Sequence, residues 1–406
     1  MSTSLTQRRY LVPFILISIL FFLWGFARAI LDVLNKHFQE VLHVSLTQST
    51  LIQAVTFLAY FLMAIPAGIF IQRQGYRRGV VFGLLLFALG AFLFIPASMA
   101  PESLIFAAFI AALFVLACGL AVLETAANPY STELGPPETA TSRINLSQSF
   151  NGLGSCLAPA LVGSYLFSGG DVTLPYVLMG CVVLLIALVF SRVELPEIKH
   201  EANQEEVIQP VSNPYRQLFR HRNFVLGLIA LLAYEVAEIS INSYFINFST
   251  MPLIVNGESL PSLMTPNQAS VVLSAALVFF MIGRFIGSAI MTHVKAEKVL
   301  LICALCSTFC IGTILLGPRP QCIYALIGNY FFESIMFPTI FSLSLRDMGQ
   351  LTKAASSLLM MTPVGGCFFI ITGYLAGVHL LLPFVIPFSC FLYILIFAYS
   401  LQRSSK

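Results

Sequence analysis

The sequence predicts an all-α membrane protein whose twelve transmembrane helices form two six-helix repeats. Three observations support this prediction: the composition, a series of long apolar runs, and a motif that occurs once in each half of the chain. Of the 406 residues, 58% are hydrophobic and only 10% are charged, whereas a soluble domain carries about 25% charged residues. A chain with so few charges could not cover a water-exposed surface with polar groups.

The apolar runs have the length of membrane-spanning helices. Such a helix needs about 20 mostly apolar residues, and continuous runs of this kind exclude a β-barrel, whose strands alternate. A net charge of +3 is too small to indicate a nucleic-acid partner. The twelve predicted spans are 10–34, 47–71, 79–99, 103–132, 144–168, 173–191, 223–248, 267–292, 297–317, 320–345, 353–377 and 380–401.

One long polar segment, 192–222, divides the chain into an N-terminal half, 1–191, and a C-terminal half, 223–406. Lys and Arg are retained on the cytoplasmic side of a membrane. With a cytoplasmic N-terminus, 17 of the 21 Lys and Arg residues fall on that side, and only Lys36 and Arg319 fall on the other. We therefore expect a multi-pass protein with both termini and the linker in the cytoplasm.

The two halves share an E-x4-P motif. It occurs as Glu124 to Pro129 in the fourth span and as Glu333 to Pro338 in the tenth. Two six-helix repeats joined by a cytoplasmic linker are typical of transporters whose substrate site lies between the halves, near the middle of the membrane.

Charged residues inside the spans are the first candidates for function, because each costs about 2.5–3.5 kcal/mol at the bilayer centre. A buried carboxyl can be neutral in one conformation and ionised in another, which is what proton coupling requires. The sequence leaves the roles of Glu235 and Glu333 open and favours a gate contact for Arg284. The full set is Arg28, Asp32, Glu124, Glu235, Glu238, Arg284 and Glu333.

The first span places Trp24, Arg28 and Asp32 on one stripe, since they are spaced by four residues. An indole face can stack on the C–H face of a sugar while the two charged groups bind its hydroxyls. We favour this interpretation over an alternative in which Arg28 and Asp32 neutralise each other and Trp24 is an interfacial anchor.

Further polar stripes lie on three other spans. Glu124 and Asn128 precede Pro129, which frees a backbone carbonyl one turn back. The fifth span carries Asn145, Gln148 and Asn151 at a spacing of three, which favours a cavity wall over simple helix–helix contacts. In the seventh span Glu238 and Asn242 share one face. We expect Gln148, Asn151, Glu238 and Asn242 to bind substrate and Glu124, with Asp32, to handle the proton.

No sequence feature indicates an enzyme or a resident cofactor. The nine cysteines lie mostly in apolar runs without partner histidines, so we expect buried, inert thiols rather than a metal site. Walker, HExxH and GxSxG motifs do not occur. The alternative to sugar uptake is an exporter or antiporter of an organic anion that Arg28 would bind.

Five segments resemble the fucose:proton symporter family of the major facilitator superfamily. The resemblance covers both halves and implies the major facilitator fold, a place in the bacterial inner membrane, and proton-coupled import of fucose, glucose, galactose or an amino sugar. It also implies roles for Asp32 and Glu124 in sugar and proton handling, and places Trp24, Gln148 and Asn151 at the cavity. The segments are 21–32 (FFLWGFARAILD), 123–129 (LETAANP), 143–151 (RINLSQSFN), 281–287 (MIGRFIG) and 337–343 (FPTIFSL).

The chain departs from the family pattern in the first span. Fucose-transporting members have an Asn pair where this chain has Arg28 and Ala29, so the sugar itself is not defined by the resemblance. The number of coupled protons, or coupling to Na⁺ instead, is likewise undefined. We expect a monomer in the lipid bilayer whose only other partners are a small sugar and protons.

Overall fold

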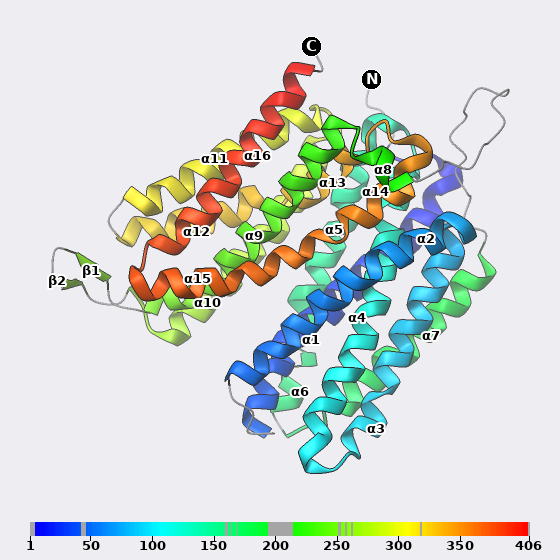
Figure 1. Ribbon diagram of the computed structural model, residues 1–406, viewed down its shortest axis with the longest axis horizontal. Coiled ribbons are helices and arrows are strands. Elements are labelled where there is room, and N and C mark those ends of the chain that lie inside the picture. The colour runs from blue at the N-terminus through cyan, green and yellow to red at the C-terminus, as the bar shows by residue number, and fades with distance from the viewer. Residues whose placement is uncertain are drawn as a thin grey trace.

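A computed structural model gives the structure of the protein, and it describes residues 5–41, 46–158, 161–162, 164–167, 169–193, 214–250, 253–255, 258–260, 263–316 and 319–404. These residues form a bundle of helices with one two-stranded hairpin (Figure 1). Nothing in the bundle resembles a layered α/β domain, in agreement with the all-α prediction.

The N-terminal half contains long, mostly apolar helices. Its elements are η1 (Arg8–Tyr10), α1 (Leu11–Val41), α2 (Leu46–Phe92), α3 (Phe94–Ser98), α4 (Glu102–Glu133), η2 (Pro137–Thr139), α5 (Ala140–Ala158), α6 (Ser164–Phe167) and α7 (Thr173–Arg192). Element α2 joins the second and third predicted spans. It is broken at Gly75, whose φ of 83° is accessible to glycine at little steric cost.

The C-terminal half has more interruptions. Its elements are α8 (Pro214–Leu218), α9 (Arg222–Thr250), β1 (Leu253–Val255), β2 (Glu258–Leu260), α10 (Pro266–Ile290), α11 (Ala296–Leu316), α12 (Arg319–Glu333), α13 (Met336–Leu345), η4 (Gly349–Leu351), α14 (Thr352–Leu359), η5 (Thr362–Phe368), α15 (Phe369–Val378), η6 (Leu382–Phe384) and α16 (Val385–Ser404). The hairpin pairs Leu253 with Leu260 in antiparallel register.

The described residues contain nine segments that are long and apolar enough to cross a membrane, and one of these, Ala54–Ser98, has the length of two spans. The two remaining predicted spans correspond to α5 with α6 and to α14 through α15. Helix α5 is long enough to span but is too polar to qualify. The segments from α14 through α15 are each too short. This arrangement is consistent with twelve spans.

Each half has its own hydrophobic core. One cluster of buried side chains comes from residues 14–190, and the other comes from residues 218–401 with Ala64 and Ile144 added. The predicted linker boundaries stay a prediction, because residues 194–213 lie outside the described part of the chain. One expectation is wrong: Cys156, Cys181 and Cys367 are exposed, because they lie on outer helix faces that a bilayer would cover.

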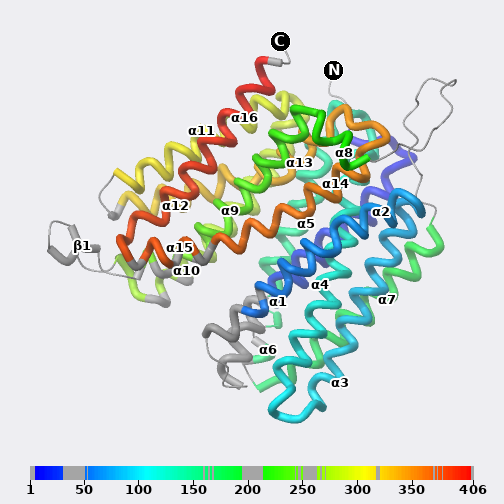
Figure 2. Tube along the Cα trace, viewed as in Figure 1, coloured from blue at the N-terminus to red at the C-terminus, as the bar shows by residue number. Residues whose placement is uncertain are grey.

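The halves meet at the face of the bundle that carries both chain ends, which we call the terminal face. Away from it, α10 and α15 of one half lie apart from α3 and α6 of the other (Figure 2). Within the N-terminal half, α1 and α5 cross closely. A Cβ on Gly25 would lie 2.0 Å from the Asn151 carbonyl oxygen, and one on Gly154 would lie 2.1 Å from that of Phe22. Glycine at both positions is therefore required by this crossing.

Arg143 fixes the terminal face of the N-terminal half. Its side chain is fully buried, although its position at the end of a predicted span suggests a solvated charge. It donates hydrogen bonds of 2.7–3.2 Å to the carbonyl oxygens of Leu5, Ser131 and Pro136 and to the hydroxyl of Thr139, and a further one to the Thr132 carbonyl oxygen. The guanidinium thus joins the N-terminal segment, the end of α4 and the start of α5.

Replacing Arg143 should destabilise the fold. Arg143→Ala removes the donors to these buried acceptors, and each acceptor left without a donor costs about 1–3 kcal/mol. We expect a clear drop in the thermal unfolding temperature of the detergent-solubilised protein. Arg220→Ala, which removes an exposed guanidinium, is the matched control and should unfold like the wild type. Equal unfolding temperatures for the two variants would contradict this role.

Candidate functional site

One face of α1 carries Trp24 and Arg28. The Trp24 side chain is 9% exposed, and its indole N–H donates a hydrogen bond of 2.8 Å to the Tyr60 hydroxyl on α2. The Arg28 guanidinium carbon lies 5.9 Å from the centre of the Trp24 ring. Unlike its neighbours Ala27 and Ile30, which are buried, Arg28 is exposed. A cation and an aromatic ring are thus presented side by side.

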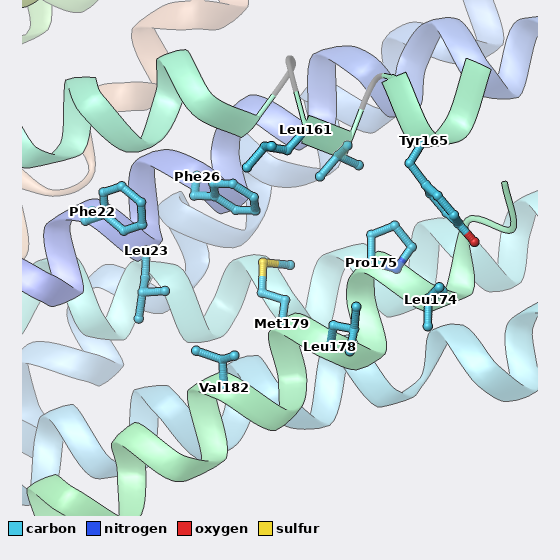
Figure 3. A pocket seen from close by; sticks show the side chains of 11 residues that line it. Phe22, Leu23, Phe26, Leu161, Tyr165, Leu174, Pro175, Leu178, Met179 and Val182 are labelled. Atoms are coloured by element: carbon cyan, nitrogen blue, oxygen red, sulfur yellow. The ribbon is translucent and has the colours of Figure 1, made fainter. Parts of the chain in front are cut away.

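The opposite face of α1 is apolar. Phe22, Leu23 and Phe26 line a pocket together with residues of α7, and Figure 3 shows Met179 and Leu178 across from them. Phe22 and Phe26 are each two residues from Trp24, which places them roughly 160° away around a helix of 3.6 residues per turn. This pocket therefore belongs to the face of α1 that is turned away from Trp24 and Arg28.

A chain of hydrogen bonds runs from the C-terminal half to Glu124. Arg284 of α10 donates from Nη1 to the carbonyl oxygen of Gln148 at 3.0 Å and to its Oε1 at 3.3 Å. Gln148 Nε2 donates to Asn128 Oδ1 at 3.2 Å, and Asn128 Nδ2 lies 3.5 Å from Glu124 Oε1. All four side chains are buried. The motif residues of α4 and α5 are therefore linked to a cation of the other half.

Glu124 has an oxygen that this chain leaves free. Its carboxyl is 4% exposed, and Oε2 has no hydrogen-bond partner of normal geometry among the described residues, although the Tyr60 hydroxyl lies close enough to interact with the carboxyl. Tyr60, which holds the Trp24 indole, interacts electrostatically with both Glu124 and Arg28. The Trp24–Arg28 pair and the Glu124 carboxyl thus belong to one neighbourhood. A buried carboxyl with an unused oxygen is suited to take up a proton, because protonation removes the uncompensated charge.

Helix α9 adds acidic side chains from the other half. Glu235 is buried and its Oε2 has no described partner, whereas Glu238 is only half-buried. Both attract Arg28 electrostatically. Asn242, also half-buried, accepts a hydrogen bond of 2.6 Å from the Tyr330 hydroxyl. The predicted site residues of α1, α4 and α9 are therefore close enough for their charges to act on one another.

Two predicted residues have a different environment from that expected. The amide of Asn151 donates to the Phe21 carbonyl oxygen at 3.3 Å, so in this conformation it joins α5 to α1. Asn145 donates to the Thr141 carbonyl oxygen and to the Thr339 hydroxyl. Asp32 lies on α1, but its side chain is outside the described residues.

Hydrogen bonds between the halves close the terminal face. Ser142 and Ser288 exchange two bonds, each from one hydroxyl to the other's carbonyl oxygen, at 2.6 and 2.8 Å. The hydroxyls of Thr141 and Ser342 lie 2.9 Å apart. These polar contacts therefore join the two halves near the face that carries the chain ends.

Sequence reasoning missed Tyr60 and Tyr330. Each tyrosine hydroxyl is bonded to a predicted site residue, Trp24 in one case and Asn242 in the other. A tyrosine in an apolar span is common, and only the partner across the helix interface distinguishes these two. Within the described part of the chain, no three His, Cys, Asp or Glu side chains are grouped as a metal ion would require.

Comparison with known proteins agrees with this geometry. Residues 17–370 match the family model of the Major Facilitator Superfamily. The glucose/galactose transporter of Brucella abortus biovar 1 (strain 9-941) is 34% identical over 405 residues, covering 96% of this chain and 94% of the relative. The L-fucose-proton symporter of Escherichia coli (strain K12) is 33% identical and covers 97% and 93%, respectively.

Solved structures show the same fold. The transporter FucP in the outward conformation superposes with a TM-score of 0.83 at 32% identity, over 97% of this chain and 99% of that one. The proton:xylose symporter XylE bound to 6-bromo-6-deoxy-D-glucose has a TM-score of 0.74 at 12% identity, over 95% and 94% of the two chains. The second likeness concerns the fold alone.

The Tyr60–Trp24 hydrogen bond should be visible by fluorescence, because Trp24 is the only tryptophan of the chain. Tyr60→Phe removes the acceptor of the indole N–H, so the emission maximum should shift to shorter wavelength. Tyr399→Phe removes an exposed hydroxyl and should leave the spectrum unchanged. Identical spectra for Tyr60→Phe and the wild type would contradict the hydrogen bond.

Proposed function

Because the chain belongs to the Major Facilitator Superfamily, we propose that it is a symporter that imports a hexose or related monosaccharide together with protons. The observation that carries this proposal is the single neighbourhood that joins an aromatic–cation pair, Trp24 and Arg28, to a buried carboxyl, Glu124. The printed functions of its relatives, glucose/galactose transport and L-fucose-proton symport, support the same substrate class.

The terminal face is proposed to be cytoplasmic, in the inner membrane of a bacterium. Arg8, Arg9 and Arg403 flank the first and last helices there, in keeping with the retention of basic residues in the cytoplasm. The polar contacts at this face, and the likeness to a transporter in the outward conformation, support the proposal that the described state is outward-facing. Sugar would enter from the periplasm, between the separated ends of the two halves.

For the sugar, the proposed contacts are Trp24, Arg28, Glu238 and Asn242. Trp24 offers a ring for the apolar face of a pyranose, and the exposed Arg28 offers several N–H donors to hydroxyl oxygens. Glu238 and Asn242 are half-buried on α9, which belongs to the other half of the chain. Gln148, Asn151 and Asp32 complete the proposed set. Gln148 and Asn151 would exchange their present partners for sugar hydroxyls.

For the proton, the proposed carrier is Glu124, with Asp32 assisting. An outward-facing state would load a proton on the free Oε2 of Glu124, and sugar would bind to the neighbouring groups. Reorientation that requires both ligands to be bound passes the free energy of the proton gradient to the sugar. In the inward-facing state the proton would leave to the cytoplasm.

Removing the Glu124 carboxyl should weaken coupling without stopping sugar movement. In proteoliposomes with zero membrane potential and a pH difference of one unit, each coupled proton contributes roughly a tenfold sugar ratio at equilibrium. Glu124→Gln should therefore lower the ratio at which net flux is zero by about tenfold, while exchange of labelled sugar at equal concentrations continues. Glu102→Gln, an exposed change on the same helix, is the control. An unchanged ratio in Glu124→Gln would contradict the assignment.

The substrate class can be tested by competition. Labelled sugar uptake should be inhibited by at least one of fucose, glucose, galactose, mannose and N-acetylglucosamine, and not by hexose phosphates. Arg28→Gln should raise the KM by about tenfold, equivalent to a loss of about 1.4 kcal/mol. Arg192→Gln, which changes an exposed guanidinium, should have no effect.

The same experiment decides the alternative function. An exporter or antiporter of an organic anion would prefer the phosphates or acids and would lose that preference in Arg28→Gln. The acidic side chains of Glu235 and Glu238 close to Arg28 would repel an anionic substrate. We therefore expect the neutral sugars to inhibit uptake more strongly than the phosphates or acids. Transport of none of the five sugars would contradict the hexose proposal.

A further inference from the structure

The two E-x4-P motifs have the same local chemistry. A proline has no N–H to donate to the carbonyl four residues earlier in a helix. In each motif that carbonyl belongs to the residue after the glutamate: Thr125 after Glu124, and Ser334 after Glu333. Helix α4 continues through Pro129, whereas the second motif breaks the chain into α12 and α13 at Ser334 and Ile335.

Both freed carbonyls accept hydrogen bonds that matter for the contact between the halves. The Ser356 hydroxyl of the C-terminal half donates to the Thr125 carbonyl oxygen of the N-terminal half at 3.1 Å. Arg284 Nε donates to the Ser334 carbonyl oxygen at 3.0 Å, and the same guanidinium donates to Gln148 of the N-terminal half. The residue after Glu124 is thus bonded directly to the other half, and the residue after Glu333 is bonded to the guanidinium that contacts the other half.

The two carboxyls also have matching environments. Glu333 is fully buried, as Glu124 nearly is. Asn329, one turn before Glu333, donates to its Oε2 at 2.7 Å, as Asn128 does to Glu124 from one turn after it at 3.5 Å. In each case the second oxygen, Oε1 of Glu333 and Oε2 of Glu124, has no partner among the described residues.

An ionised carboxylate at Glu333 would be poorly compensated. One amide hydrogen bond does not repay the transfer of a full charge from water to a membrane interior, whereas a proton on the free oxygen neutralises the group. A metal cation would need several oxygen ligands, and a proton needs only this one. The site therefore suits a proton and holds it out of contact with solvent in the described state.

We propose that Glu333 is a second proton-binding site, in the C-terminal half, that is loaded and unloaded in the same transport cycle as Glu124. The proposal rests on the symport function above and extends it to two protons per sugar. The carboxylate takes its proton from the periplasmic side before Glu333 is buried as in the described state, and the proton later leaves to cytoplasmic water as the free ion, so that no other group is oxidised, reduced or consumed.

The charges around Glu333 give a mechanism for release. Tyr234 and Glu238 act on it from α9, Arg284 from α10, Cys310 from α11, and Tyr330 from its own helix. Glu238 opposes a negative charge on Glu333, and Arg284 favours one. In the described state the Arg284 guanidinium is occupied by Ser334 and Gln148. When the halves separate at the terminal face, Arg284 loses Gln148 and can stabilise the ionised carboxylate, which releases the proton.

The test is the sugar ratio at zero net flux, in sodium-free proteoliposomes with the membrane potential clamped to zero and a pH difference of one unit. Two coupled protons predict a ratio of about a hundredfold for the wild type, about tenfold for Glu333→Gln and for Glu124→Gln, and no accumulation for the double variant. Asp347→Asn, an exposed change in the same half, should match the wild type. A Glu333→Gln ratio equal to that of the wild type would overturn the proposal.

Two controls keep the outcome interpretable. Labelled-sugar exchange at equal concentrations, which needs no net proton movement, shows that a variant is folded and reorients. If Glu333→Gln fails in exchange, infrared spectra of the purified protein decide: the protonated-carboxyl band that Glu333→Gln removes must disappear from the wild type as the pH is raised. A band that persists at every pH would show a permanently protonated residue and overturn the proposal. A wild type that accumulates no sugar would instead refute the proposed function itself.

Discussion

One buried cation, Arg284, links the two halves of the protein in their closed arrangement. A guanidinium that is 6% exposed must have acceptors in place of water, or its burial costs several kcal/mol. Arg284 has such acceptors in Ser334 of its own half and Gln148 of the other, and the Phe280 ring lies 4.5 Å away. Separation of the halves would remove the Gln148 acceptors, so the position of this side chain and the state of the terminal face are linked.

Proline defects supply the acceptors that such an interface needs. In a regular helix the backbone carbonyls are occupied by intrahelical bonds, and only side chains remain to join one helix to another. At Thr125 and Ser334 a missing N–H makes the carbonyl itself available, and both are used. The cost of an interrupted helix is thus offset by contacts that can be exchanged when the halves move. Small hydroxyl residues, such as Ser142 and Ser288, extend the same exchangeable contact toward the chain ends.

Hydropathy alone was enough to predict the class of fold, because long apolar runs leave few alternatives in a membrane. It also brought Glu124, Gln148 and Glu333 to attention, since a buried polar group is costly and must have a partner. Which partner could not be predicted: Asn151, expected at a cavity, contacts the Phe21 carbonyl, and Tyr60 carried no signal of its own. Arg143 was one of the 17 basic residues expected on the cytoplasmic side, and its position in the sequence does not reveal the acceptors around its side chain. The partner of each of these side chains is set by how the helices pack against one another, which the local sequence does not show.

The docking of the first residues has a consequence for biosynthesis. The Leu5 carbonyl oxygen is bonded to Arg143 and Thr139, and the Thr6 hydroxyl to the Leu134 carbonyl oxygen. The ribosome makes these partners, Leu134, Thr139 and Arg143, only after the fourth predicted span. At about 5–20 residues per second, the N-terminal segment waits roughly ten seconds for them. During that time the N-terminal segment lacks these partners, so α1 must be inserted and retained in the membrane without this anchor. The N-terminal segment then binds to helices that are already in the bilayer.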